Sequence, residues 1–383
     1  DASINAFAAP GGIIGINTGM FIKTETEGQF ASVMCHELAH LSQRHYARSQ
    51  QNNNPLTNAL ILLGSVATAV VTANPQAILI APALIQQLAT NYTRENEREA
   101  DRIGFRNLVN AGFDPRSQSQ MFQILQKSQS GINEEYSYLF THPIPKERIT
   151  DARIREENID NQSNYRNSLE FYLVKARAEV ANSKNLSSLK EFYLSKQKNN
   201  DNKIKLYKKY GLSLVLKEQK KYEESFKAAR ELLKETPSNL IFQTNILEIH
   251  LAEGNSLEAI SIGERLLNVN SNNFSISYYL AKAYILDNNP EKAEEILINL
   301  SKENPRDPTV WYELAEAQGL AGNIIGLHRS RAEYFILTGR YDSAIFQLRE
   351  GLKLSKNFFE IRESIINKLE QIYKTKRALK DLT

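Results

Sequence analysis

Two histidines and a glutamate, His36, Glu37 and His40, lie within five residues near the start of the chain. A helix repeats every ~3.6 residues, so His36 and His40 would lie one turn apart on one face, with Glu37 beside the first. Imidazoles at this spacing suit a zinc ion, and the carboxylate suits a general base for hydrolysis. The alternative is a buried helix whose histidines only form hydrogen bonds, because so short a pattern also arises by chance.

The residues around this motif predict a helix that faces the core. The segment contains no Gly or Pro after Gly28, and apolar residues recur at helical spacing, namely Phe30, Val33, Met34, Leu38 and Leu41. The single cysteine of the chain, Cys35, falls inside this helix, so no intrachain disulfide can form. We expect Cys35 to behave as a small buried apolar residue.

A second polar segment, residues 92–104, predicts a helix that runs to a stop at Gly112. Glu97 and Asp101 would lie one turn apart on its surface. Glu97 could then be a third zinc ligand, and Asp101 could accept the second N–H of a ligating histidine. The alternative is a solvated run of helix charges, in which Glu97 or Glu99 pairs with arginines.

Between these two segments, residues 49–93 carry no charge at all. Two apolar runs, 56–71 and 78–88, are separated by Asn74-Pro75, and each is shorter than the ~20 residues that a membrane span needs. We interpret them as a helical hairpin packed on the catalytic domain or over its cleft, with membrane contact as the alternative.

Two shorter segments complete the candidate catalytic domain. Within residues 4–22, a turn at residues 10–12 precedes a β-branched run, which predicts a strand. This strand could hold an extended peptide by backbone pairing, or it could be an ordinary strand of a small sheet. His142 precedes Pro143 in an extended segment, a pattern that is also typical of a surface turn.

From about residue 165 the chain becomes rich in Lys, Glu, Leu and Tyr, and a 34-residue repeat appears. Its units start near Leu206, Leu240, Phe274 and Pro308, and Gly254 and Gly322 share the turn between the two helices of a unit. Gly339 opens a further turn half a period on, so one helix should serve two neighbours. Residues 165–200 resemble degenerate early helices and 357–383 a polar cap. Such a solenoid exposes a surface for peptides or partner proteins, unless it only supports the catalytic domain.

Composition adds few constraints. With 42% apolar and 24% charged residues, the 383-residue chain is ordinary for a soluble globular protein. The 47 Lys and Arg against 44 Asp and Glu give a net charge of +3, which offers no broad basic field, so nucleic acid is not an expected partner. The sequence starts at Asp1 without a signal-like segment, which suggests a processed or trimmed chain.

The two motifs together, His36-Glu37-Leu38-Ala39-His40 and Glu97-Arg98-Glu99-Ala100-Asp101, resemble the HtpX-like and CAAX prenyl protease family of zinc metallopeptidases over roughly residues 4 to 150. The resemblance implies one Zn²⁺ per chain, held by His36, His40 and Glu97, with Glu37 as the general base. It also implies that Asp101 orients a ligand and that His142 approaches the metal as an additional ligand that keeps the enzyme latent. Gly15 departs from the bulkier residue that the resemblance leads us to expect on the strand, and we expect the N-terminal helices of the family to be missing from this chain.

The expected fold is therefore mainly α: a zincin-type metallopeptidase domain with a small β-sheet over residues 1–160, followed by an α-solenoid of tetratricopeptide repeats over 161–383. The resemblance to members with such repeats implies a periplasmic endopeptidase of the HExxH gluzincin type with a chaperone-like role. It would cleave misfolded or stalled outer-membrane proteins, dock on the β-barrel assembly machinery through its repeats, and touch the membrane at most peripherally. The alternatives are a repeat-based adaptor whose metal site is largely silent, and a membrane-inserted processing peptidase.

Overall fold

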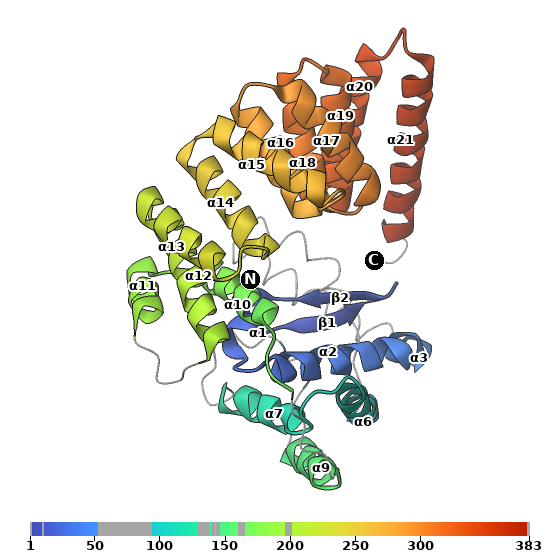
Figure 1. The fold of residues 1–383 in the computed structure, drawn as a ribbon. Helices are drawn as coiled ribbons and strands as arrows, with labels where there is room; N and C mark the ends of the chain where they lie inside the picture. The colour runs from blue at the N-terminus through green and yellow to red at the C-terminus, as the bar shows by residue number, and fades with distance from the viewer. Residues whose placement is uncertain are drawn as a thin grey trace. The chain divides into compact units, whose positions relative to one another are not determined.

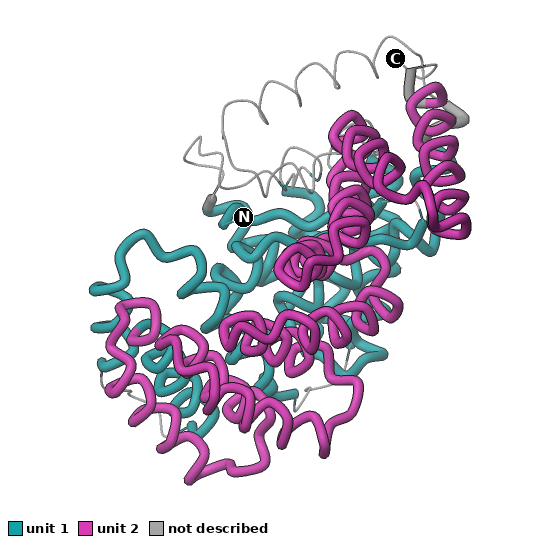
Figure 2. The backbone as a smooth tube through the Cα atoms, turned by 90° about the horizontal axis from the view of Figure 1, so that it is seen from above, with its two compact units in different colours: residues 1–215 teal, residues 216–383 magenta. Residues whose placement is uncertain are grey.

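The computed structural model describes residues 2–9, 11–52, 94–128, 138, 142, 146–159, 165–195 and 201–380. As the sequence predicts, these residues are mainly helical and form one small two-stranded sheet (Figure 1). The chain divides into two compact units, residues 1–215 and 216–383 (Figure 2). This division follows spatial contacts, and the predicted domain boundary after residue 160 remains a prediction.

The first unit contains both strands and the first helices of the chain. Its elements are β1 (Ala6–Ala9), β2 (Ile13–Ile16), α1 (Thr18–Lys23), α2 (Glu27–Ser42), α3 (His45–Asn52), α6 (Arg94–Asn110), α7 (Arg116–Ser128), α9 (Lys146–Glu157), α10 (Leu169–Ala181) and α11 (Leu186–Leu194). Helix α12 (Asn202–Glu218) begins in this unit and ends in the second. The β-hairpin lies along one side of α2, while α6 and α7 pack against the helix from another side (Figure 1).

The hairpin at the start of the chain is antiparallel, with Ala6 opposite Ile16 and Phe7 opposite Gly15. The predicted strand is confirmed as β2, but the sequence analysis missed β1, which is fully buried. The register also explains the unexpected Gly15, because a Cβ there would lie only 2.2 Å from the ring of Phe7. The buried Phe7 ring thus fills the space that a side chain at position 15 would take.

Helix α2 begins with a capping box, in which the Thr26 side chain accepts from the Gln29 backbone and the Gln29 side chain reaches back to Thr26. The helix is confirmed, but the predicted apolar stripe is wrong in part: Leu38 is 48% exposed and Met34 only half-buried. The buried face carries His36, Glu37 and His40 instead, together with small residues such as Ala39. Polar chemistry occupies this face because α6 brings complementary polar groups against it.

Helix α6 approaches α2 closely enough to bring the two motifs together. Ala39 of α2 and Ala100 and Ile103 of α6 form a buried seam of small and apolar side chains. One turn after Ala100, Gly104 lies against the α2 backbone, and a Cβ at this position would lie 3.0 Å from the backbone nitrogen of His36. A glycine at this position therefore sets the distance between the helices. The predicted end of α6 is confirmed, since the helix stops at Asn110 and Gly112 follows with φ +83°.

The second unit is a succession of antiparallel helix pairs. Its elements are α13 (Tyr222–Glu235), α14 (Leu240–Glu253), α15 (Ser256–Val269), α16 (Phe274–Leu286), α17 (Pro290–Glu303), α18 (Pro308–Leu320), α19 (Ile324–Leu337), α20 (Tyr341–Leu354) and α21 (Phe359–Lys380). Helices α14, α16 and α18 begin at the predicted unit starts, and Gly254 and Gly322 have positive φ in the predicted turns. The 34-residue repeat is confirmed.

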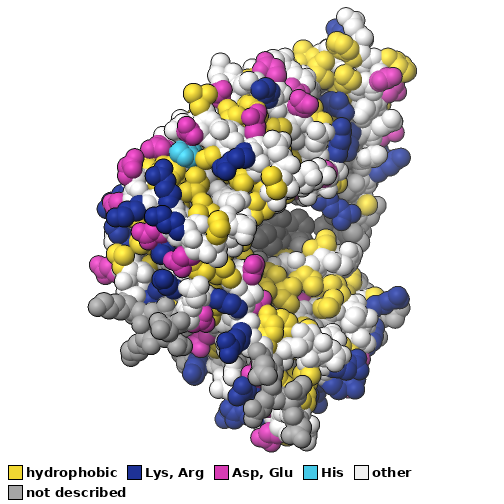
Figure 3. Space-filling model, viewed as in Figure 1, with side chains coloured by type: hydrophobic (Ala, Val, Ile, Leu, Met, Phe, Trp, Pro, Cys, Tyr) yellow, Lys and Arg dark blue, Asp and Glu magenta, His cyan; other side chains and the backbone are white. Residues whose placement is uncertain are grey.

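The last helices also follow the predicted pattern. Helix α19 packs against both α18 and α20, so one helix does serve two neighbours. Helix α21 buries Ile365, Leu369 and Ile372 against α20 and so covers the end of the apolar core of the solenoid. The predicted polar cap is only partly polar, since α21 exposes Phe359 and Tyr373. On the face shown in Figure 3, acidic and basic side chains are intermixed over the solenoid helices.

Two further expectations concern membranes. The apolar runs 56–71 and 78–88, interpreted as a helical hairpin, lie outside the described residues. None of the described helices combines the length and the apolar character that crossing a bilayer would take.

Candidate metal centre

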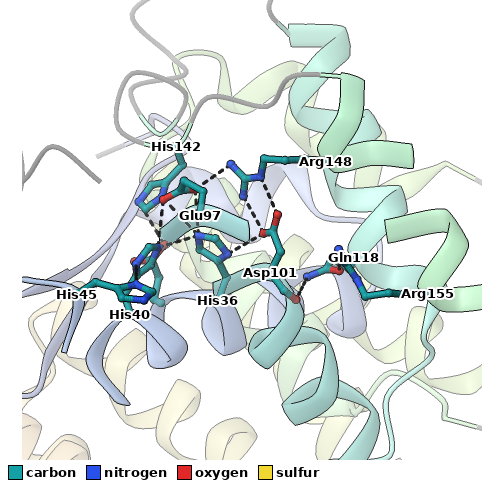
Figure 4. A network of polar contacts seen from close by, with 10 residues as sticks. His36, His40, His45, Glu97, Asp101, Gln118, His142, Arg148 and Arg155 are labelled. Carbon is teal, nitrogen blue, oxygen red and sulfur yellow. Dashed lines mark hydrogen bonds and ion pairs between the residues drawn. The ribbon is translucent and has the colours of Figure 1, made fainter. Parts of the chain in front are cut away.

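Four predicted site residues meet in one buried cluster. His36 and His40 come from α2, Glu97 comes from α6, and His142 lies between α7 and α9 in the chain (Figure 4). One potential ligand atom from each lies within 4.8 Å of all the others. The Nε2 atoms of His36 and His40 are 2.9 Å apart, and Glu97 Oε1 is 3.3 Å from His40 Nε2. All four residues are at most 4% exposed.

The orientation of the two α2 imidazoles favours a cation at the centre of this cluster. His36 Nδ1 lies 3.0 Å from Asp101 Oδ1, a pure acceptor when ionised, so Nδ1 carries the proton. In the neutral ring, Nε2 then presents a lone pair toward His40 Nε2 and the Glu97 carboxylate. Lone pairs and a carboxylate that converge in a buried cluster repel one another unless a positive charge or a proton lies between them. The donor set of two imidazoles and one carboxylate suits zinc.

The protonation preferences of the cluster reflect the same crowding. Burial alone would lower the pKa of His36, but the hydrogen bonds with Asp101 and Glu97 outweigh it and raise the pKa to about 10. Burial lowers the pKa of His40 well below its ordinary value, and the neighbouring His36 adds to this effect. Burial would raise the pKa of Glu97, yet the surrounding histidines hold it well below the usual range. The cluster therefore keeps an ionised carboxylate that attracts either a proton or a metal cation.

Asp101 lies one turn after Glu97 and is held by a buried arginine. Arg148 of α9 donates to both Asp101 oxygens, from Nε at 2.7 Å and from Nη2 at 2.8 Å, and its Nη1 lies 2.8 Å from Glu97 Oε2 (Figure 4). Burial would raise the pKa of Asp101, but the charge of Arg148 and hydrogen bonds with His36 and Arg148 lower it to about 2. Arg148 thus fixes two carboxylates against the histidines that they face.

Glu37 is fully buried on α2 beside the cluster. Its Oε1 lies 3.6 Å from His142 Nε2. Burial raises the pKa of the Glu37 carboxyl, while the nearby His142, His36 and Tyr138 oppose this rise. A carboxylate with a raised pKa next to a candidate metal centre has the properties of a general base.

His142 reaches the cluster although it lies far along the chain from the helices. Its Nδ1 is 3.0 Å from Glu97 Oε1 and 3.4 Å from His36 Nε2. The ring stacks on Tyr138 at 4.6 Å between centroids, and the Tyr138 backbone donates to Ile4 before β1. The structure therefore places His142 in the buried cluster with His36, His40 and Glu97 rather than in a surface turn.

The sequence analysis missed three residues that contact the cluster, namely Tyr138, Arg148 and His45. Arg148 is one of several arginines around α9, and only its 3% exposure distinguishes it. His45 lies just after α2, and its Nδ1 is 2.8 Å from His40 Nδ1. Cys35 is half-buried rather than fully buried, and burial raises its thiol pKa to about 11, so the thiol remains protonated at neutral pH.

A buried group of histidines and a glutamate that could hold a metal ion, followed by repeated helix pairs, is the arrangement expected of a metallopeptidase with a repeat domain. The comparison with family models agrees. Peptidase family M48 matches residues 1–156, and the tetratricopeptide repeat matches residues 250–318.

Individual relatives extend the match over most of the chain. The beta-barrel assembly-enhancing protease of Escherichia coli O157:H7 is 34% identical over 351 residues, which cover 89% of this chain and 71% of that protein. The Yersinia pestis protein of the same name is 32% identical and covers 91% of this chain and 72% of that protein. Mitochondrial metalloendopeptidase OMA1 of Arabidopsis thaliana is 32% identical over 40% of this chain and 30% of that protein. The chain therefore belongs to peptidase family M48, together with the beta-barrel assembly-enhancing proteases.

Proposed function

We propose that the chain is a zinc endopeptidase of the HExxH gluzincin type, in which His36, His40 and Glu97 hold one zinc ion. The convergence of two imidazole Nε2 atoms and the Glu97 carboxylate in a buried cluster carries this proposal. When bound, zinc would supply Lewis acidity that acidifies a water molecule and polarises a peptide carbonyl. The remaining chemistry falls to the side chains of the chain itself.

Glu37 is the general base in this proposal. Its carboxylate would accept a proton from the attacking water and return that proton to the leaving amine. Burial favours the first step, because it raises the pKa of the Glu37 carboxyl and so makes the carboxylate a stronger base. Asp101 does not touch the substrate in this scheme, but holds the His36 ring through Nδ1.

His142 acts in the proposal as an additional ligand that keeps the enzyme latent. The ring lies within the ligand cluster, with Nδ1 3.0 Å from Glu97 Oε1, where it would compete with a water molecule or a substrate carbonyl for the metal. Activity then depends on the fraction of molecules in which His142 is withdrawn, so an activating partner must bind that state more tightly.

The substrate would bind in extended form along β2, whose outer edge pairs with no other strand of the described residues. Such pairing uses backbone groups and tolerates many sequences. Because the relatives are named for the assembly of β-barrels, we infer that the substrates are misfolded or stalled outer-membrane proteins in the periplasm. The tetratricopeptide helices would then dock the β-barrel assembly machinery.

The proposal is tested by zinc content together with cleavage of an unfolded protein such as casein, for the native chain and for His142→Ala. We expect one zinc per chain in both proteins and faster cleavage by His142→Ala. Absence of zinc from the native chain would refute the metal site. A zinc-loaded His142→Ala protein that cannot cleave, yet binds partners through its repeats, would instead favour the adaptor.

A further inference from the structure

A series of polar contacts leads from the proposed zinc ligand His40, which is buried, to the protein surface. His40 Nδ1 lies 2.8 Å from His45 Nδ1, and His45 Nε2 lies 3.0 Å from Glu99 Oε2 (Figure 4 shows both histidines). Arg48 Nη1 in turn donates to the same Glu99 oxygen at 3.0 Å. His45 is completely buried, whereas the Glu99 side chain is 29% exposed.

If His40 binds a metal through Nε2, the contacts determine which ring nitrogens of His40 and His45 carry protons. The Nδ1 of a neutral imidazole ligand must then carry the proton, and this proton points at His45 Nδ1. His45 Nδ1 must therefore be an acceptor, which places the His45 proton on Nε2. That nitrogen faces the Glu99 carboxylate, a pure acceptor when ionised. Each ring thus has a donor and an acceptor in the required place.

The local backbone is built to bring His45 back onto His40. Five residues along an uninterrupted helix correspond to about 140° around the axis, so the two side chains would point in different directions. Instead α2 ends at Ser42, and Arg44 takes a left-handed conformation with φ +53° before α3 begins at His45. A residue other than glycine rarely adopts this conformation, which indicates that the turn is imposed by its surroundings.

The two histidine ligands are consequently oriented in different ways. His36 Nδ1 contacts the Asp101 carboxylate directly, whereas His40 Nδ1 contacts a second imidazole, His45, which in turn contacts the Glu99 carboxylate. We propose that His45 is a positioning residue for zinc binding. Its Nδ1 accepts a hydrogen bond from the Nδ1–H of His40, and its own ring is oriented by Glu99. This inference rests on the proposed zinc site. The alternative is that His45 only fills the core.

The matched variants His45→Asn and His45→Leu separate the two roles. Both side chains have a similar size and shape, but only asparagine offers an oxygen near the former Nδ1 position. Zinc affinity is measured by competition with a chromophoric chelator. We expect a loss of about 10–100-fold for His45→Leu and a value close to native for His45→Asn. As a spectroscopic readout, the visible absorption of the Co²⁺-loaded protein should change in His45→Leu and remain native in His45→Asn.

A second variant, Glu99→Ala, keeps the positioning role testable even if His45→Leu does not fold. Glu99→Ala leaves the core intact and removes only the carboxylate at the far end, and we expect it to weaken zinc binding severalfold. Native affinity in both His45→Leu and Glu99→Ala, or equal losses in His45→Leu and His45→Asn, would overturn the positioning role while leaving the proposed zinc site standing. A native chain that binds no zinc would refute the proposed function and this inference with it.

Discussion

Replacing Arg148 by methionine tests whether its guanidinium holds the two carboxylates of the site. The Arg148 side chain is 4% exposed and contacts Asp101 at 2.7 and 2.8 Å and Glu97 at 2.8 Å. Methionine keeps most of the volume but leaves both carboxylates without this charge.

The size of the effect follows from the pKa of Asp101 and from burial. The Asp101 pKa falls from an ordinary 3.8 to about 2, with the charge of Arg148 as the largest opposing influence to burial. A shift of this size corresponds to about 2 kcal/mol. Glu97 loses a partner as well, so we expect Arg148→Met to lower the free energy of unfolding by about 3–5 kcal/mol, as for other broken buried pairs. Arg148→Met with Asp101→Asn should cost less than the sum of the single variants.

The assay is urea unfolding in the presence of a chelator, in which the unfolding of the first unit is monitored by hydrogen exchange in peptides from α2, α6 and α9. The only tryptophan, Trp311, lies in the second unit, so its fluorescence transition is an internal control that should move less. Arg153→Met, at an exposed position of α9, is the matched control and should change stability by less than about 0.5 kcal/mol. If Arg148→Met lowered the free energy of unfolding by less than about 1 kcal/mol, Arg148 would not be needed to hold the two carboxylates.

Three further predictions concern the packing and the charges of the first and second units. Gly104→Ala should lower the free energy of unfolding by about 1–3 kcal/mol and weaken zinc binding, because the added Cβ would press on the α2 backbone at His36. Arg106→Ala, on the exposed face of α6, is the control, and an unchanged zinc affinity of Gly104→Ala would contradict the prediction. Because the Asp101 pKa is depressed, its stabilising contribution is complete above pH 3.8 and is lost as the pH falls toward 2; acid unfolding monitored by hydrogen exchange of α6 should show this dependence in the native chain and not in Asp101→Asn. Gly254→Ala, at φ +89°, should destabilise the repeats by about 1 kcal/mol in thermal unfolding while leaving zinc content unchanged.

Much of the architecture could be predicted from local sequence patterns. The repeat could be predicted because helix starts at Leu240, Phe274 and Pro308 recur at a fixed interval, as is typical of units that stack on their neighbours. The positions of His36, His40, Glu97 and Asp101 could be predicted because each pair lies one turn apart on one helix.

Other features depend on contacts that no local pattern encodes. The exposed Leu38 of α2 was assigned to the core because hydrophobicity alone suggested it, but polar partners on α6 turn the opposite face inward. Strand β1 was missed because a run of four small and aromatic residues forms no alternating pattern. Arg148 and His45 were missed because a buried arginine and a histidine after a turn differ from surface residues only in the folded chain.

The central claim, that Glu37 performs chemistry at a zinc centre, is tested most directly by comparing His142→Ala with the double variant His142→Ala, Glu37→Gln at equal zinc content. Both proteins are loaded with zinc, the metal is quantified, and the cleavage rate of an unfolded protein is measured. We predict one zinc per chain in both proteins, cleavage by His142→Ala, and a rate reduced by at least about 100-fold in the double variant. Cleavage by the double variant at an undiminished rate would contradict the account.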